Sequence, residues 1–291
     1  MIILINQSFH QRVKQATRDF AEAQSQRYGS IVKENMAPYI ETTRYLREGF
    51  ENYSPGGLDK EMGKLTSQLE QTISQNRDID AVWGILEPAS TDKADSSGAK
   101  APHQMAHVYS RVNGKIKFQD QAMRGWNAIF TDEDYQQIKN NGSETILLTS
   151  NRDLVGEKNS SLRYAAPVMR NGRIAGVVGV KFSLSRLTQQ IQQFEPFDKG
   201  HAFLMAHNGK IIGLEQEGTL RERIQNAGFH NRPDINLDQS THGGNIFQAK
   251  LASKESQGPA MFISMVPVKL GQTKSPWFAG LVAHHQTIAR P

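Results

Sequence analysis

The chain has 291 residues, of which 37% are hydrophobic and 22% charged, the composition of a soluble globular protein with room for about two domains. It contains no cysteine, which excludes disulfides, thiolate metal sites and a cysteine nucleophile. The net charge is +5, but the basic residues are scattered and form no run or stripe, so we expect no nucleic-acid partner.

The chain begins with a short apolar segment, Met1–Ile5, which polar residues follow at once. We interpret it as the end of a transmembrane helix whose remainder lies outside this sequence. The alternative is a vector-derived start followed by a frayed terminus. Elsewhere no run reaches the roughly 18 apolar residues that a membrane helix needs.

A long amphipathic helix is predicted from Phe9 to Phe50, because apolar residues recur there at a near-heptad spacing. Pro38 lies inside it, and we expect a kink or a break at this position. A helix of about forty residues is about 60 Å long, too long to be buried in one small domain. It should therefore run alongside both domains or pack against a second copy, and the pattern leaves core packing and dimerisation open.

Short elements follow this helix up to about residue 195. We expect helices at Leu58–Asn76 and Asp132–Lys139, and strands at Ala81–Leu86, His107–Val112, Lys115–Phe118 and Thr145–Thr149. The segment Glu87–Pro102 is rich in Pro, Ser, Asp and Gly without periodicity, which predicts a loop.

Two similar hairpins, Tyr164–Lys181 and Gly200–Gly213, are the most informative part of the sequence. Each consists of a strand, an Asn-Gly turn and a second strand, and Asn-Gly accepts the positive φ angles of a two-residue hairpin. The turns are Asn171–Gly172 and Asn208–Gly209. The strand Ile174–Phe182 is almost wholly apolar, which predicts a buried central strand.

An amphipathic helix at Leu184–Phe194 joins the two hairpins, and a second domain starts near Pro196. Further strands are expected at Asn245–Ala249, Met261–Val268 and Trp277–Ala283. Helices thus lead and an antiparallel meander follows, which favours an α+β fold over a parallel sheet. We divide the chain into two leading helices (1–76), a first sheet module (77–195) and a second (196–291).

Segments along nearly the whole chain resemble the double Cache domain, the extracytoplasmic ligand-binding domain of many bacterial chemoreceptors and sensor kinases. They are AVWGILEPASTDKAD (Ala81–Asp95), VYSRVNGKI (Val108–Ile116), YAAPVMRNGRIAGVVGVKFSLSRLTQQI (Tyr164–Ile191), GHAFLMAHNGKIIG (Gly200–Gly213) and MVPVKLGQTKSPWFAGLVA (Met265–Ala283). The resemblance implies a long helix rising from the membrane and two stacked PAS-like modules, with small ligands usually held in the membrane-distal one.

The sequence departs from the amino-acid-binding members of this family. In those members an Asp at the end of the GVVGV-type strand binds the ligand ammonium, and this position is Lys181 here. Their compact Arg-x-Trp-Tyr cluster is absent, and the nearest counterparts are Arg111, Arg124-Gly125-Trp126 and Tyr135. A cation facing an ammonium is unfavourable in a partly buried site, so we expect a carboxylate-bearing or other anionic ligand near Lys181. Alternatively, Lys181 points out of the pocket or pairs with Asp153 or Glu157, with the ligand elsewhere or lost.

The candidate ligand-binding residues are Tyr109, Arg111, Trp126, Tyr135, Asp153, Tyr164 and Lys181. A metal site from His103 and His107 with Asp92 and Asp95 is conceivable, but exposed polar loops often have this composition, so we predict neither metal nor cofactor. There is no G-x-S-x-G nucleophile elbow and no glycine-rich phosphate loop before a helix, so we predict no enzyme.

The sequence thus predicts the periplasmic sensor domain of a bacterial inner-membrane chemoreceptor that is a homodimer through its N-terminal helix. A bound small molecule would shift this helix relative to the membrane. The output domain could equally be a histidine kinase or a diguanylate cyclase. Two other classes remain open, a ligand-free dimerisation module and a secreted hydrolase.

Overall fold

The computed structural model describes residues 2–53, 58–87, 105–120, 132–148, 161–194, 200–212, 224, 247–251 and 261–284. Its helices are α1 (Ile2–Glu51), α2 (Leu58–Gln75), α3 (Asp132–Asn141) and α4 (Ser185–Gln193). Its strands are β1 (Ile79–Leu86), β2 (Met105–Val112), β3 (Lys115–Asp120), β4 (Thr145–Leu148), β5 (Ser161–Arg170), β6 (Arg173–Ser183), β7 (His201–Met205), β8 (Ile211–Ile212), β9 (Phe247–Leu251), β10 (Met261–Val268) and β11 (Trp277–His284).

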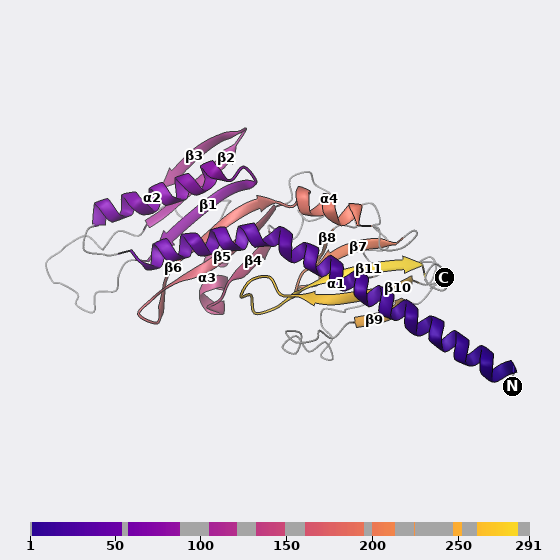
Figure 1. The fold of residues 1–291 in the computed structure, drawn as a ribbon. Coiled ribbons are helices and arrows are strands. Elements are labelled where there is room, and N and C mark those ends of the chain that lie inside the picture. Colours follow the sequence, from indigo (N-terminus) through magenta and orange to yellow (C-terminus); the bar gives the residue numbers. More distant parts are fainter. Residues whose placement is uncertain are drawn as a thin grey trace.

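These strands form two antiparallel sheets, which α1 crosses in turn (Figure 1). The first sheet has the order β3-β2-β1-β6-β5-β4 and the second has the order β8-β7-β11-β10-β9. Each pair of neighbouring strands runs antiparallel. The predicted α+β fold is therefore confirmed, and β6 lies at the centre of its sheet, as its apolar sequence requires.

The α1 helix is 50 residues long and continues through Pro38, so the possibility of a break there was wrong. Its buried stripe begins at Ala21 and reaches Phe50. The stripe consists of Ala21, Ser25, Tyr28, Val32, Met36, Ile40, Thr43, Leu46 and Phe50. Phe20, which the heptad pattern placed on the buried face, is 50% exposed, because the buried face of α1 at this turn holds Ala21 and Ser25, and adjacent helix residues point about 100° apart.

The α1 helix lies very close to the second sheet at Gly29. A Cβ atom at this position would lie 3.2 Å from Val266 Cγ2 and 3.3 Å from Val268 Cγ2, tighter than usual packing. Nearby, the Ser25 hydroxyl is within 3.0 Å of the Ser264 hydroxyl of β10, and both side chains are fully buried. The small residues on this part of α1 thus let the helix backbone approach the strands.

The two predicted Asn-Gly hairpins differ. Asn171 and Gly172 both have positive φ angles (48° and 73°), as a two-residue hairpin needs. At the second hairpin only Gly209 has a positive φ, and the bond from the Ala206 amide to the Lys210 carbonyl closes a longer loop. The Asn208 side-chain oxygen accepts a hydrogen bond from the Lys210 amide there, so this Asn stabilises the loop through its side chain.

Each sheet separates two apolar clusters. One face packs against α1 and, at the end nearer β2, against α2, and these residues form one continuous core through both sheets. The opposite face of the first sheet packs against α3, and the opposite face of the second sheet has its own cluster. Nowhere in the described residues is a helix long and apolar enough to cross a membrane.

Candidate functional site

The face of the first sheet that turns towards α3 has a packed apolar part. Trp83, Ile85, Ala106, Val108, Ala165 and Val177 of the strands are buried there with Tyr135, Ile138 and Leu147. Gly179 of β6 lies beneath the Trp83 indole, which a Cβ atom at this position would overlap. Trp83 therefore fills the middle of this face.

Beside Trp83 the same face becomes polar. The strand registers align Ser110 with Ala81, Ala81 with Lys181, and Lys181 with Arg163, in one row across β2, β1, β6 and β5. Val178 and Val180 pack towards α1 whereas Val177 packs towards α3, so the alternation of β6 places Lys181 on the α3 face. The small Ser110 and Ala81 leave Lys181 and Arg163 as the two large members of this row, and both are cationic.

α3 is held to this face by two sets of polar contacts. Arg163 is 5% exposed, and its guanidinium donates to both carboxylate oxygens of Asp134. At the other side, the Tyr135 hydroxyl and the Lys139 ammonium each lie 2.6 Å from Glu87 Oε1, just after β1. Burial raises the pKa of Glu87, but these two hydrogen bonds outweigh burial and bring the pKa below its usual value.

Asp80 adds a carboxylate next to this row. Burial raises its pKa, and the charges of Lys181 and Arg111 act in the opposite direction without cancelling the effect. Lys181 therefore already has a carboxylate in its neighbourhood, contributed by β1.

Of the seven predicted ligand-binding residues, the five that the structure describes do not converge on one place. Tyr135 and Lys181 lie on the α3 face. Tyr109 and Tyr164 belong to the core on the opposite face, where Tyr109 contacts the Phe118 ring. The Arg111 guanidinium donates a hydrogen bond of 2.6 Å to the Ile73 carbonyl in the last turn of α2. It therefore helps to cap the C-terminus of that helix. Trp126 and Asp153 lie outside the described residues, as does Glu157, the other partner considered for Lys181.

The potential metal ligands are likewise separated. His107 Nδ1 lies 2.8 Å from the Thr66 hydroxyl of α2, whereas His103, Asp92 and Asp95 lie outside the described residues. Among the residues that the structure describes, no group of three or more His, Cys, Asp or Glu side chains could hold a metal ion.

A buried carboxylate, Glu144, joins the two sheets and α1, and the sequence did not point to it. It lies between α3 and β4 with its side chain 1% exposed. Arg44 of α1 donates to both of its oxygens at 2.8 and 3.0 Å, and the Tyr164 hydroxyl donates from β5. The Gln272 amide, in the turn between β10 and β11, donates to the same carboxylate. We call this arrangement the Glu144 junction.

The pKa of Glu144 reflects these donors. Burial raises it, but the hydrogen bonds from Arg44, Tyr164 and the Gln272 amide together lower it below its usual value. Burial and the Glu144 carboxylate both raise the pKa of Tyr164. Gly271 makes the junction possible, because its φ is +63° and a Cβ atom there would overlap the Tyr164 hydroxyl.

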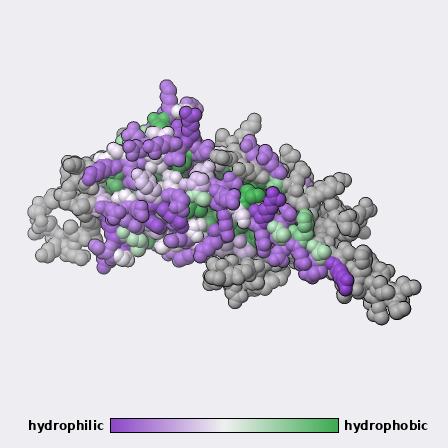
Figure 2. All heavy atoms as spheres, viewed as in Figure 1, coloured by the Kyte–Doolittle hydropathy of each residue, from purple (hydrophilic) through white to green (hydrophobic). Residues whose placement is uncertain are grey.

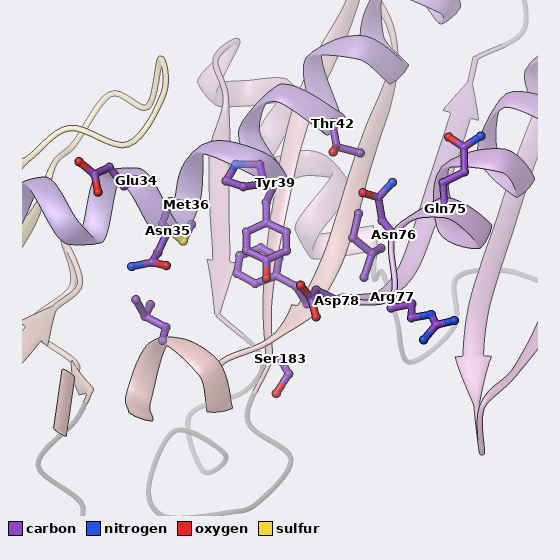
Figure 3. A pocket seen from close by; sticks show the side chains of 14 residues that line it. Glu34, Asn35, Met36, Tyr39, Thr42, Gln75, Asn76, Arg77, Asp78 and Ser183 are labelled. Carbon is purple, nitrogen blue, oxygen red and sulfur yellow. The ribbon is translucent and has the colours of Figure 1, made fainter. Parts of the chain in front are cut away.

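A groove of about 370 Å³ lies on the α1 side, where that helix passes from one sheet to the other (Figure 3). Its walls come from α1, from the turn between α2 and β1, and from the end of β6 with the start of α4. The lining residues are Glu34, Asn35, Met36, Pro38, Tyr39, Thr42, Gln75, Asn76, Arg77, Asp78, Ile79, Phe182, Ser183 and Leu187. The Tyr39 ring stacks on the Phe182 ring with centroids 3.7 Å apart.

No family model and no curated protein sequence matches the chain. Solved structures do match. The extracellular domain of the proposed histidine kinase mmHK1S-Z2 matches with a TM-score of 0.63 at 18% identity, over 96% of this chain and 99% of that one. Methyl-accepting chemotaxis protein X gives 0.59 at 19% identity, over 94% and 99%. The Campylobacter jejuni chemoreceptor Tlp3 ligand-binding domain, in complex with L-valine, gives 0.58 at 14% identity, over 97% and 98%.

The chain therefore has the fold of extracellular sensor domains of chemoreceptors and histidine kinases. The resemblance to double Cache sensor domains that the sequence predicted is confirmed at the level of the fold. The Tlp3 structure is described as a ligand-binding domain, and the mmHK1S-Z2 structure as the extracellular domain of its histidine kinase.

Proposed function

We propose that this chain is the extracytoplasmic sensor domain of a membrane-anchored receptor and that it binds a small anionic solute in its first sheet module (77–195). The support for a sensor is the fold that it shares with chemoreceptor and histidine kinase domains over nearly its whole length. The support for an anion is the row of Lys181 and Arg163 beside the small residues Ser110 and Ala81.

The charges of this row favour an anion over a plain α-amino acid. Arg163 shares its charge with Asp134, and Asp80 partly offsets Lys181, so the row is cationic but not strongly so. A carboxylate ligand would accept from the Lys181 ammonium and from the Ser110 hydroxyl, which lies two strands away across the small Ala81. An ammonium at the same place would face Lys181 directly, which is unfavourable in a partly buried site. Tyr109, Arg111 and Tyr164 face away from this row, so we assign them no ligand contact.

The Glu144 junction provides a route by which such binding would reach α1. α3 covers the proposed site and is tied to it through Asp134 and Tyr135. Just after this helix, Glu144 is bound to Arg44 of α1 and to the Gln272 amide of the second sheet. A ligand that changes the position of α3 would therefore change the position of α1 and of the β10–β11 turn together. A shift of about 1–2 Å along a helix is typical of such switches.

The direction of α1 suits a receptor. α1 begins at the end of the molecule where β11 finishes, and it extends beyond the second sheet there (Figure 1). The proposal places this end towards the membrane and the first sheet away from it. It also includes a homodimer through α1, since the large apolar side chain of Phe20 on this helix is half exposed. A chemoreceptor is the output that we propose, with a histidine kinase or diguanylate cyclase as alternatives.

The test is thermal unfolding of the protein with a panel of small organic acids, amino acids, amines and purines. A ligand at a hundred times its dissociation constant adds about 2.7 kcal/mol to the stability, which raises the midpoint by several degrees in a domain of this size. We expect an organic acid to give such a rise, and Lys181→Asp to abolish it. Lys33→Asp is the matched control, because Lys33 is exposed on α1, away from this row and its neighbour Lys117, which pairs with Ser110.

Three outcomes would contradict parts of the proposal. A rise that survives Lys181→Asp would keep the sensor but remove Lys181 from its site. A rise with amines or neutral amino acids alone would contradict the anionic ligand. No rise with any member of the panel would favour a structural module or a protein ligand.

A further inference from the structure

The groove beside Pro38 has no place in the proposed anion site, because it lies on the opposite side of the first sheet. Phe182, in its floor, belongs to the core that faces α1, whereas Lys181, the next residue back, faces α3. From the chemistry of its walls we propose that this groove is a second ligand site, which binds a small organic cation such as a diamine. The inference does not depend on the anion site.

Pro38 supplies the first part of the argument. Proline has no backbone N–H, so it cannot donate to the carbonyl of Glu34, the residue four positions earlier in α1. Glu34 and Pro38 both line the groove. The Glu34 carbonyl therefore lacks the i+4 backbone donor that other carbonyls of the helix have, and it is an acceptor beside the groove. A ligand with N–H donors would meet this requirement.

Two amide side chains add acceptors. Asn35 Nδ2 donates to the Ile31 carbonyl at 2.8 Å, and Asn76 Nδ2 donates to the Thr72 carbonyl at 2.8 Å. Each amide nitrogen gives one of its two N–H groups to a backbone carbonyl of the preceding helical turn, and the group of each side chain that can accept from a ligand is its oxygen. One of these acceptors comes from α1 and the other from the end of α2, on two different walls of the groove.

A carboxylate and an aromatic ring in the groove favour a positively charged ligand. The Asp78 carboxylate lies beside the Tyr39 ring, whereas the Arg77 side chain extends away from that ring (Figure 3). Tyr39 is stacked on Phe182, so its ring is held in place as part of the floor. A carboxylate, an aromatic ring and several carbonyl oxygens together suit an ammonium group, through charge-assisted hydrogen bonds and cation–π attraction. The volume of about 370 Å³ is within the range of small-molecule sites.

A cation bound here would contact α1, the α2–β1 turn and the end of β6 at once. It would therefore hold α1 against the first sheet at the residue where the helix hydrogen bonding is interrupted. The groove would act on the same helix as the anion site but with the opposite ligand charge.

The experiment is isothermal titration of the full chain with putrescine, using 1,4-butanediol as the uncharged analogue. We expect saturable binding of putrescine and none of the diol. Asp78→Asn, which keeps the shape of the side chain, should weaken putrescine at least about tenfold, the effect of about 1.4 kcal/mol. Glu48→Gln is the matched control, because it removes one negative charge from an exposed position of α1 outside the groove. It should leave the affinity within about twofold of the wild type, less than about 0.5 kcal/mol.

Lys181→Asp separates this proposal from the anion site. Putrescine binding that is unchanged in this variant and weakened in Asp78→Asn supports the groove. The inference is overturned if putrescine gives no saturable heat, if 1,4-butanediol binds as tightly, or if Asp78→Asn binds putrescine as the wild type does. If no organic acid in the panel raises the unfolding midpoint, the putrescine titrations still test the groove, since the two sites take ligands of opposite charge.

Discussion

The two sheets share one construction but differ on the face turned away from α1. In each, a glycine of a central strand lies under an aromatic ring from the neighbouring strand, Gly179 under Trp83 in the first sheet and Gly280 under Phe203 in the second. Around Phe203 the described buried residues are apolar, namely Met205, Ile211, Ile224, Ile263, Met265, Phe278 and Val282. Around Trp83 the apolar cluster adjoins Lys181 and the buried Arg163.

The first sheet thus holds a buried charged group, the Arg163 guanidinium, that the stability of the fold alone does not require. A buried guanidinium loses its hydration, and its ion pair often contributes no more than an apolar side chain of the same size would. The first sheet nevertheless keeps Arg163, bound by Asp134, whereas the described side chains on the far face of the second form an apolar cluster. The comparison supports binding in the first sheet and a mainly mechanical role for the second.

The largest expected effect comes from disrupting the Glu144 junction, because this junction connects the two sheets. Glu144→Gln should lower the free energy of unfolding by about 3 kcal/mol, since it removes the charge of a buried carboxylate that Arg44 and other donors surround. Urea denaturation measures this loss. Glu41→Gln is the matched control, because Glu41 also pairs with Arg44 but is 70% exposed, and its loss should be below about 0.5 kcal/mol.

The same variant tests whether the junction couples the sheets. Hydrogen exchange of residues 269–276, the turn that holds Gln272, should become faster in Glu144→Gln although the substitution lies in the first module. Unchanged exchange in this turn would show that the second sheet is positioned without Glu144, and the route to it that we propose would be wrong.

Substitutions of Gly179 and Gly280 compare the two sheets directly, with smaller expected losses of stability than Glu144→Gln. Gly179→Ala should destabilise the chain by about 2 kcal/mol, because the new Cβ would overlap both the Trp83 indole and the Tyr164 carbonyl oxygen, which is backbone and cannot rotate away. Gly280→Ala should cost less, since the atoms it would overlap all belong to the Phe203 ring. Gly63→Ala on α2 is the control, because nothing lies near its Cβ position, and there alanine should stabilise the helix by up to about 1 kcal/mol. Equal losses for Gly179→Ala and Gly280→Ala would argue against backbone contact as the deciding factor.

The elements of this fold could be predicted from the sequence because they depend on local patterns. The apolar run of β6 and the Asn171–Gly172 turn each specify a strand or a hairpin within a few residues, and the structure has them there. The hairpin at Asn208 was predicted with the wrong turn, because its side chain rather than a positive φ stabilises the loop. Phe20 followed the heptad pattern, but the buried face of α1 at this turn holds Ala21 and Ser25, whose small side chains give a weaker signal in the sequence.

The contacts that define the sites depend on residues far apart in the chain. Arg44 and Glu144 are 100 residues apart, and neither has a spacing or motif that sets it apart from other charged residues. Tyr164 was predicted to bind a ligand, but strand alternation places its ring on the helix side, where Glu144 accepts its hydroxyl. Lys181 could be placed from the sequence because it ends a recognisable strand, and its contact with a ligand stays a prediction.

The smallest effect concerns pH, and it compares one histidine from each sheet region. Burial lowers the pKa of His107, with the Asp120 charge acting in the opposite direction, and burial also lowers the pKa of His207. In the unfolded chain a histidine has a pKa of about 6.5. As the pH falls through that value the unfolded state therefore takes up protons first, and stability declines until the lower pKa of the folded state is passed.

The decline should thus begin about one pH unit above 6.5 and continue as the pH falls below 6.5, towards the lowered pKa of the folded state. His107→Gln should reduce it more than His207→Gln, because His107 is partly enclosed by Thr66 of α2 and the Phe118 ring, whereas His207, at the turn after β7, keeps more of its surface in solvent and burial acts on it less. The measurement is the free energy of unfolding in urea at several pH values for the wild type and both variants. A larger change for His207→Gln would mean that the second sheet region, despite its apolar far face, is the more sensitive of the two to protonation.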